Sequence, residues 1–222
     1  MSPTPTSPLR AAAIFATTSG LIAVSFGVLA RTGGVSLPMT CAMSLVVFAG
    51  GAQFLAIATI ASGGSPLAAV VGGIVLNARH LPYGLAVAPF LRGPLWKRAL
   101  SSQIVLDEST ALALAQPTPE LGRVAFYACG CMLFVAWNLG TLAGALAGGA
   151  ITDPSALGLD AAFPASMLAL LAPLLRQRDV RAAALAGAVI ALAATPFTAP
   201  GVPILLAALG VFVARLVPAG PA

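Results

Sequence analysis

The sequence of 222 residues contains very few charged side chains. Asp, Glu, Lys and Arg together make up 8% of it, whereas 59% of the residues are hydrophobic and the mean hydropathy is +0.99. Soluble domains carry about 25% charged residues, which keep their surfaces hydrated. A chain this poor in charge lacks the surface of a soluble protein, so its composition predicts an integral membrane protein whose helices face lipid.

Histidine and cysteine are also scarce, with one and three residues respectively. An odd cysteine count excludes a fully paired disulfide framework, and Cys41, Cys129 and Cys131 all lie in apolar stretches, as small buried hydrophobic residues do. One histidine and scattered cysteines supply too few ligands for a metal site. A Ser–His catalytic pair would depend on His80 alone. We therefore expect no enzyme activity, no catalytic residues, no metal and no cofactor.

Eight apolar segments approach the ~20 residues that a helix needs to cross a bilayer. Short loops rich in Gly and Pro separate them, so residues 1–10 are predicted to be a short polar tail and residues 11–217 a single transmembrane helical domain. The first segment is long and more segments follow, which favours a retained span over a signal peptide. The segments are 11–30, 38–61, 66–91, 99–116, 123–150, 157–175, 182–197 and 201–217.

The basic residues lie mainly between the apolar segments, which is the pattern of cytoplasmic loops and not of a nucleic-acid interface. The clusters 92–98 and 176–181 should face the cytoplasm, which requires an even number of spans between them, yet three segments intervene. Segment 99–116 is the most polar of these, so we expect it to be re-entrant or packed inside other helices. The prediction is an all-α polytopic membrane protein with seven spans and an external N-terminus, or eight spans with a weaker charge bias.

Polar residues inside apolar segments are unfavourable in lipid and are therefore candidates for function. Asn77, Arg79 and His80 lie near the middle of segment 66–91. Pro82 has no N–H group, so the carbonyl of Ala78 loses its helical partner and a break in the helix is predicted there. A broken helix at mid-membrane offers bare backbone groups to a small ligand. Two short helices with Arg79 reaching the membrane surface are the alternative.

Adjacent carboxylates form a second group, at Asp107 and Glu108 in segment 99–116. On a continuous helix Gln103, Asp107 and Thr110 would share one face. These carboxylates are candidates to pair with Arg79, to bind an ammonium group or to carry a proton. A segment end in the headgroup region, where charge is tolerated, is the alternative.

Three further polar or amphipathic side chains lie deep in apolar segments: Gln53, Trp137 and Asn138. Each is a candidate to contact a ligand or to line a cavity, and Gln53 fits a helix-to-helix hydrogen bond equally well. Asp160 is placed to favour a helix N-terminus.

Glycines at four-residue spacing, at Gly140, Gly144 and Gly148, allow two helix backbones to approach closely. The close approach could serve a contact between subunits or packing within the chain, and the pattern alone favours neither.

Several stretches resemble the AzlC family, the large subunits of two-component exporters of branched-chain amino acids. The most specific are Phe-Ala-Gly-Gly-Ala-Gln-Phe at 48–54 and Asn-Ala-Arg-His at 77–80. Pro82 is a departure, since an aliphatic residue is more usual there. The resemblance covers most of the chain and weakens after residue 175. The matching stretches are 25–30, 44–54, 77–84, 107–109 and 157–160.

The resemblance implies export of valine, leucine and isoleucine, extending to methionine, driven by the proton gradient across a bacterial cytoplasmic (inner) membrane. It also implies a small hydrophobic membrane partner of the AzlD type. We therefore expect a permease whose partners are that subunit, an amino acid substrate and the lipid bilayer, without nucleic acid. An intramembrane enzyme, and a passive channel or assembly subunit without transport of its own, are the competing hypotheses.

Overall fold

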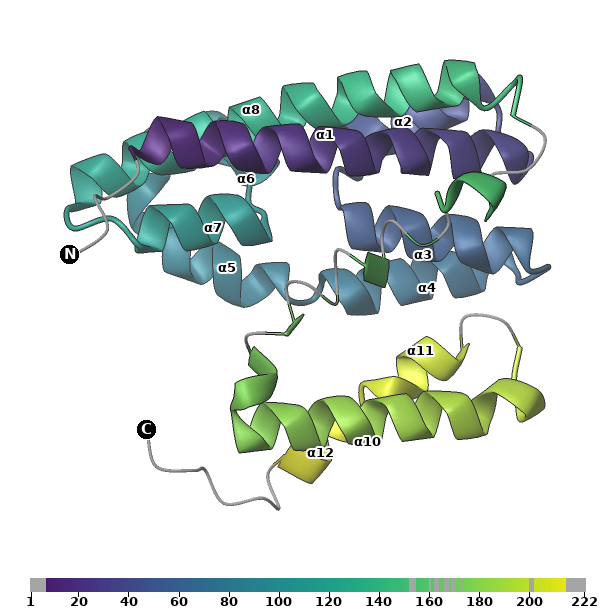
Figure 1. The fold of residues 1–222 in the computed structure, drawn as a ribbon. Helices are drawn as coiled ribbons and strands as arrows, with labels where there is room; N and C mark the ends of the chain where they lie inside the picture. The colour runs from purple at the N-terminus through teal and green to yellow at the C-terminus, as the bar shows by residue number, and fades with distance from the viewer. Residues whose placement is uncertain are drawn as a thin grey trace. The chain divides into compact units, whose positions relative to one another are not determined.

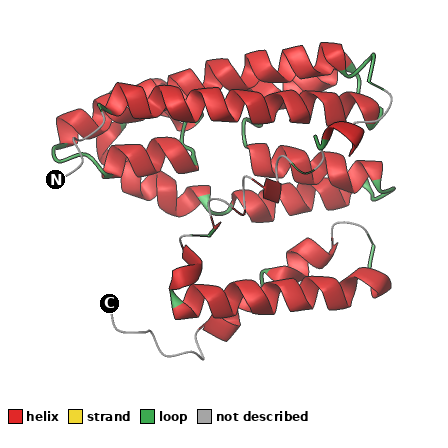
Figure 2. Cartoon of the chain, in the orientation of Figure 1, coloured by secondary structure: helices red, strands yellow, loops and turns green. Residues whose placement is uncertain are grey.

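The computed structural model describes residues 7–151, 155–159, 161, 164–165, 168, 171–172, 174–199 and 202–214. Within these residues the chain forms helices and turns and no strand, as Figure 2 shows. It divides into two compact units, one of Met1–Gln53 with Asn77–Thr152 and the other of Phe54–Leu76 with Asp153–Ala222. The all-α prediction is therefore confirmed for the described residues, and each unit is treated below by itself.

Two long helices, α1 (Pro8–Thr32) and α8 (Pro119–Ala147), run side by side in the first unit (Figure 1). Both begin at a hydroxyl cap with proline in the first turn, the arrangement that satisfies free N–H groups at a helix start. Both are long and apolar enough to cross a membrane, as is Arg178–Phe197 in the second unit.

The glycine stripe of α8 faces α1. Added Cβ atoms at Gly140 and Gly144 would collide with the backbone of Gly20 and Val24, and one at Gly148 would lie 3.0 Å from the Cα of Val28. The spacing therefore serves packing between two helices of the same chain, which decides between the two interpretations left open by the sequence.

The other predicted spans of the first half of the chain are interrupted helices. Segment 38–61 holds α2 (Leu37–Val46) and α3 (Gly50–Ala61), and segment 66–91 holds α4 (Pro66–Asn77), α5 (His80–Val87) and the short η1 (Ala88–Phe90). At 1.5 Å per residue each α-helix here is about 12–18 Å long, roughly half of a ~30 Å hydrocarbon core. None of these helices is long enough to cross a membrane alone.

Segment 99–116 folds as a hairpin of two short helices, α6 (Leu95–Ser102) and α7 (Asp107–Leu114), packed on α8. Ser101 hydrogen-bonds Tyr127 at 2.9 Å, Ile104 lies against Gly130, and the chain returns to place Ala113 beside Gly122. Between these contacts the chain moves three residues along α8 and then returns by eight residues, or about two turns. The end of α7 therefore lies near the start of α8.

The second unit contains η2 (Ser155–Leu157), η3 (Leu174–Arg176), α10 (Arg178–Ala194), η4 (Thr195–Phe197), α11 (Val202–Ala207) and α12 (Gly210–Ala214). α10 packs on α11 and α12, and close approach occurs at Gly187 and Gly210. In the same unit Leu55 of α3 fills the space above Gly72 of α4. The candidate Asp160 and parts of segments 157–175 and 201–217 lie outside the described residues.

Candidate functional site

The break between α2 and α3 occurs at Val47–Ala49, where Phe48 adopts a positive φ of 37°. This left-handed conformation is rare for an aromatic residue and is held here by packing. The Phe48 ring meets the Phe134 ring edge-on at 4.9 Å, and the Trp137 indole occupies the space where Gly50 has no side chain. Trp137 also stacks on Phe26 and is 8% exposed. Trp137 therefore packs against the break from the middle of α8.

Two glutamine side chains cap the end of α2. Gln53 is fully buried and its Nε2 donates to the Met43 carbonyl at 2.8 Å. Gln103, in the turn between α6 and α7, donates from Nε2 to the carbonyls of Leu45 and Val46 at 3.0 and 3.1 Å. The last carbonyls of a helix have no intrahelical partner and are costly to leave bare in lipid, so these amides stabilise the break.

The break between α4 and α5 falls at Ala78 and Arg79, immediately before Pro82 as predicted. The carbonyl of Ala78 accepts from the N–H of Leu81 at 3.1 Å instead of from the missing N–H of Pro82. His80 Nδ1 lies 3.0 Å from the Asn77 carbonyl. Because a carbonyl only accepts, Nδ1 is the donor, and Nε2 is left for other partners.

Arg79 and Asp107 form a salt bridge of 3.2 Å between Nη2 and Oδ2, with each side chain 29% exposed. Arg79 stands at the break before α5, and Asp107 opens α7, which packs on α5. Tyr83 of α5 also interacts with the Asp107 carboxylate, and Glu108 interacts electrostatically with both charges of the pair. The structure therefore joins the two charged groups that sequence reasoning singled out separately.

The predicted continuous helix over 99–116, with Gln103, Asp107 and Thr110 on one face, is wrong. Residues 103–106 form a turn, so Gln103 leaves that face, and only Asp107 and Thr110 remain together on α7. The cause is Ser109, which is fully buried, accepts from the N–H of Leu106 at 3.0 Å and donates to the Ile104 carbonyl at 2.7 Å. A serine in this position starts a new helix and holds the turn before it.

Several buried polar atoms near these breaks have no hydrogen-bond partner among the described residues. They are Gln53 Oε1, Asn77 Oδ1, Arg79 Nε and Thr110 Oγ1. Buried polar atoms are normally paired, so an unpaired group calls for an explanation such as a ligand. Asn138 differs, because its amide donates to the Phe134 carbonyl at 2.8 Å within its own helix. Sequence reasoning placed Gln103 only on a helix face with Asp107 and gave no individual role to Ser109 or Tyr83, although each is a polar side chain inside an apolar segment.

The three helix breaks form one region of the first unit. The break at 47–49 contacts α8 at residues 134 and 137, the turn at 103–106 contacts it at residue 130, and the Arg79–Asp107 pair connects the third break to α7. The middle of α8 lies at these positions. Interrupted helices that expose polar groups halfway along a long apolar helix are suited to binding a small polar solute.

Residues 15–151 match the family model described as AzlC protein. The chain belongs to the AzlC family. All three breaks and the resembling stretches up to Ser109 lie within the matched region, and the family supports a role related to membrane transport.

Two relatives agree with a membrane location. One, an uncharacterized membrane protein of Archaeoglobus fulgidus, is 38% identical over 76% of this chain and 74% of its own. Another, an uncharacterized membrane protein of Helicobacter pylori (strain J99), is 27% identical over 58% of this chain and 57% of its own. No solved structure matches the chain.

Proposed function

We propose that this protein is the large subunit of a two-component secondary transporter that exports valine, leucine, isoleucine and methionine from a bacterial cell. The observation that carries the proposal is the Arg79–Asp107 pair, held between broken helices and still partly open to solvent. A free amino acid carries a carboxylate and an ammonium group, and this pair offers one opposite charge to each. The small hydrophobic partner and the inner-membrane location are parts of the proposal that rest on the family resemblance.

Substrate binding would open the ion pair. The substrate carboxylate would accept hydrogen bonds from Arg79, whose Nε is buried without a partner, in the bidentate geometry that guanidinium favours. The ammonium group would move to Asp107 or Glu108, with the unpaired oxygens of Asn77 and Gln53 as further acceptors. A proton on one of the carboxylates or on His80 would then couple export to the proton gradient.

Export is tested in cells fed a dipeptide that contains leucine or valine. Deleting this gene and that of its partner should raise the free amino acid retained inside, and the wild-type gene should restore efflux. Arg79→Gln should fail to restore it, whereas Arg178→Gln, an exposed arginine on α10, serves as the matched control and should succeed. Equal retention with and without the two genes would refute the proposed function.

Coupling and the role of the partner are tested in vesicles. The chain should move leucine against its gradient when a pH gradient is imposed and the partner is present. Downhill movement alone would identify a passive channel, and no movement under any condition would identify an assembly subunit.

Seven spans with an external N-terminus are the topology that we propose, because a re-entrant hairpin at 99–116 restores the charge rule. The test is cysteine labelling in a background without native cysteines. Cysteines placed at Lys97 and Glu120, on either side of segment 99–116, should both react from the cytoplasmic side. Reaction from opposite sides would show that this segment crosses the membrane.

A further inference from the structure

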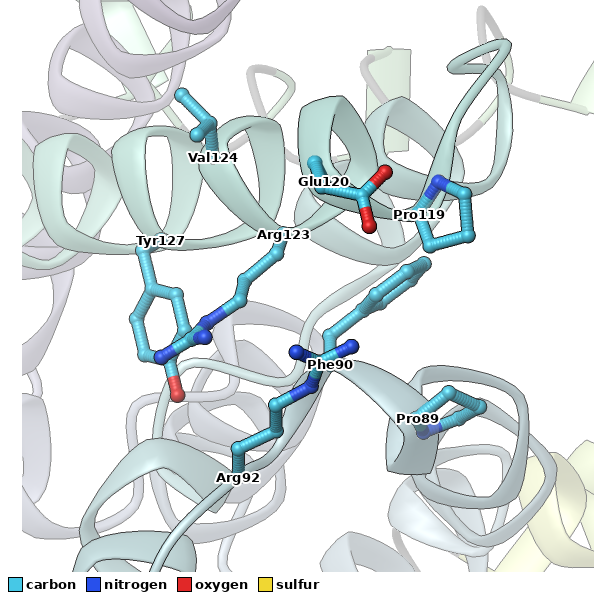
Figure 3. Close-up of a pocket in the computed structure, with 8 residues that line it drawn as sticks. All are labelled: Pro89, Phe90, Arg92, Pro119, Glu120, Arg123, Val124 and Tyr127. Carbon is cyan, nitrogen blue, oxygen red and sulfur yellow. The ribbon is translucent and has the colours of Figure 1, made fainter.

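A pocket of about 500 Å³ lies at the start of α8, and none of its lining residues belongs to the three helix breaks. Figure 3 shows its walls, formed by Phe90 and Arg92 around the end of η1 and by Glu120, Arg123 and Tyr127 of α8. Phe90 is 9% exposed and packs so closely on Gly122 that an added Cβ would lie 2.9 Å from its ring. The pocket therefore has a fixed aromatic floor and a mainly apolar lining, to which Arg92, Glu120 and Arg123 add charge.

Two arginines from different parts of the chain reach into this pocket. In Figure 3 the Arg123 guanidinium lies beside the Tyr127 ring, 5.9 Å from its centroid, and the Arg92 guanidinium lies beside Phe90. Neither arginine forms a salt bridge with a carboxylate of the described residues, where the Arg79–Asp107 pair is the one ion pair present. Two guanidinium groups that line one pocket without a salt bridge offer donors to an anion, and their planar donors match the oxygens of a phosphate.

The helix beside the pocket has the character of a membrane-surface helix. α6 exposes Trp96 and Leu100, which are four residues apart and share one face, at 61% and 68%, and it adds two further cations, Lys97 and Arg98. Short helices with an apolar face and a basic face lie in the headgroup region, where tryptophan also concentrates. The Ser101–Tyr127 hydrogen bond fixes α6 to the wall of the pocket.

We propose that this pocket binds the phosphate headgroup of an anionic phospholipid of the cytoplasmic leaflet. Arg92 and Arg123 would hold the phosphate, and the acyl chains would lie along Trp96 and Leu100. Lipid is the occupant favoured over a free anion, because α6, with its exposed Trp96 and Leu100, follows Arg92 in the chain and is hydrogen-bonded to Tyr127 of the pocket wall. Glu120 opposes binding and limits it to lipids with a full negative charge. This site is independent of the proposed transport activity, and its place in the cytoplasmic leaflet rests on the proposed topology.

The test measures quenching of Trp96 fluorescence by phosphatidylglycerol with brominated acyl chains, using the full-length protein in phosphatidylcholine nanodiscs. Trp137 is buried against Phe26 and provides a weakly quenched background. Wild-type protein should saturate at a low fraction of phosphatidylglycerol. Arg92→Gln with Arg123→Gln should raise the half-saturating fraction about thirtyfold, since each of the two cations near the surface contributes about 1 kcal/mol.

The control removes the same charge from another basic cluster, by Arg178→Gln with Arg181→Gln, and should leave the half-saturating fraction unchanged. Glu120→Gln should lower that fraction, because the opposing charge is lost. An equal rise of the half-saturating fraction in the two double variants would show that general surface charge binds the lipid and would overturn the proposal. Displacement of the lipid by inorganic phosphate would overturn lipid as the occupant.

Discussion

The Arg79–Asp107 salt bridge allows stability and transport to be measured apart. Its two atoms lie 3.2 Å apart and each side chain is 29% exposed. A fully exposed pair contributes about 0.2–1 kcal/mol, whereas removing one partner of a buried pair costs about 3–5 kcal/mol. For a pair that is about two-thirds buried we expect a coupling energy between these limits, about 1–3 kcal/mol.

The perturbation is a double-mutant cycle of Arg79→Gln and Asp107→Asn. Each single variant leaves one charge without its partner and should lower the free energy of unfolding, which for a chain of this size corresponds to a fall in Tm of about 2–10 °C. The double variant has no stranded charge, so it should be more stable than the sum of the single effects predicts, by the coupling energy. Arg79→Gln with Glu120→Gln, two residues that form no salt bridge, is the additive control.

Thermal unfolding in nanodiscs and leucine transport in vesicles are the two readouts. The double variant should unfold close to the wild-type temperature and yet transport no leucine, because both charges that would receive the substrate are gone. Additive single effects would refute the structural role of the pair. Leucine transport by a stable double variant would refute the role of the Arg79–Asp107 pair in substrate binding.

Two further changes test the packing around this region, and both are measured by unfolding of the reconstituted protein. Gln103→Leu removes the donor that caps the end of α2 and should cost about 1–3 kcal/mol, whereas Asn138→Leu, whose amide bonds within its own helix α8, should change stability by less than about 0.5 kcal/mol. An equal loss of stability in the two variants would show that the cap on α2 stabilises the protein no more than an ordinary amide hydrogen bond does. Gly144→Ala forces a Cβ into the backbone of α1 and should cost about 1–3 kcal/mol, while Gly149→Ala, which meets a neighbouring atom only at 3.6 Å, should be nearly neutral. A neutral Gly144→Ala would contradict the close packing of α1 on α8.

The break before α5 was predictable because proline acts locally. Pro82 has no N–H to offer to Ala78 in any tertiary context, so the helix is interrupted where the sequence indicates. The interruption of segment 99–116 was also within reach, since its polar residues argued against a full span. In both places the deciding residues lie within the segment itself.

The break at Val47–Ala49 was not predictable in the same way. Gly50 and Gly51 weaken a helix in segment 38–61, but Phe48 has no preference for positive φ, so local propensities do not place the break at Phe48. Residues far away in the sequence stabilise the break: the Phe134 ring of α8 packs on Phe48, and the Gln103 amide of the α6–α7 turn caps α2. Contacts between residues 57 or more positions apart leave no signal in a single sequence.

The capping of the end of α2 explains one of the free acceptors in this region. A helix end in lipid needs donors for its bare carbonyls, and the Nε2 groups of Gln53 and Gln103 are used for that purpose. Satisfying the backbone in this way leaves Gln53 Oε1 unpaired, and Asn77 Oδ1, in the same unit, is also unpaired. The same construction that holds the helices open therefore leaves oxygen acceptors suited to an ammonium group, while Arg79 remains the cation suited to a carboxylate.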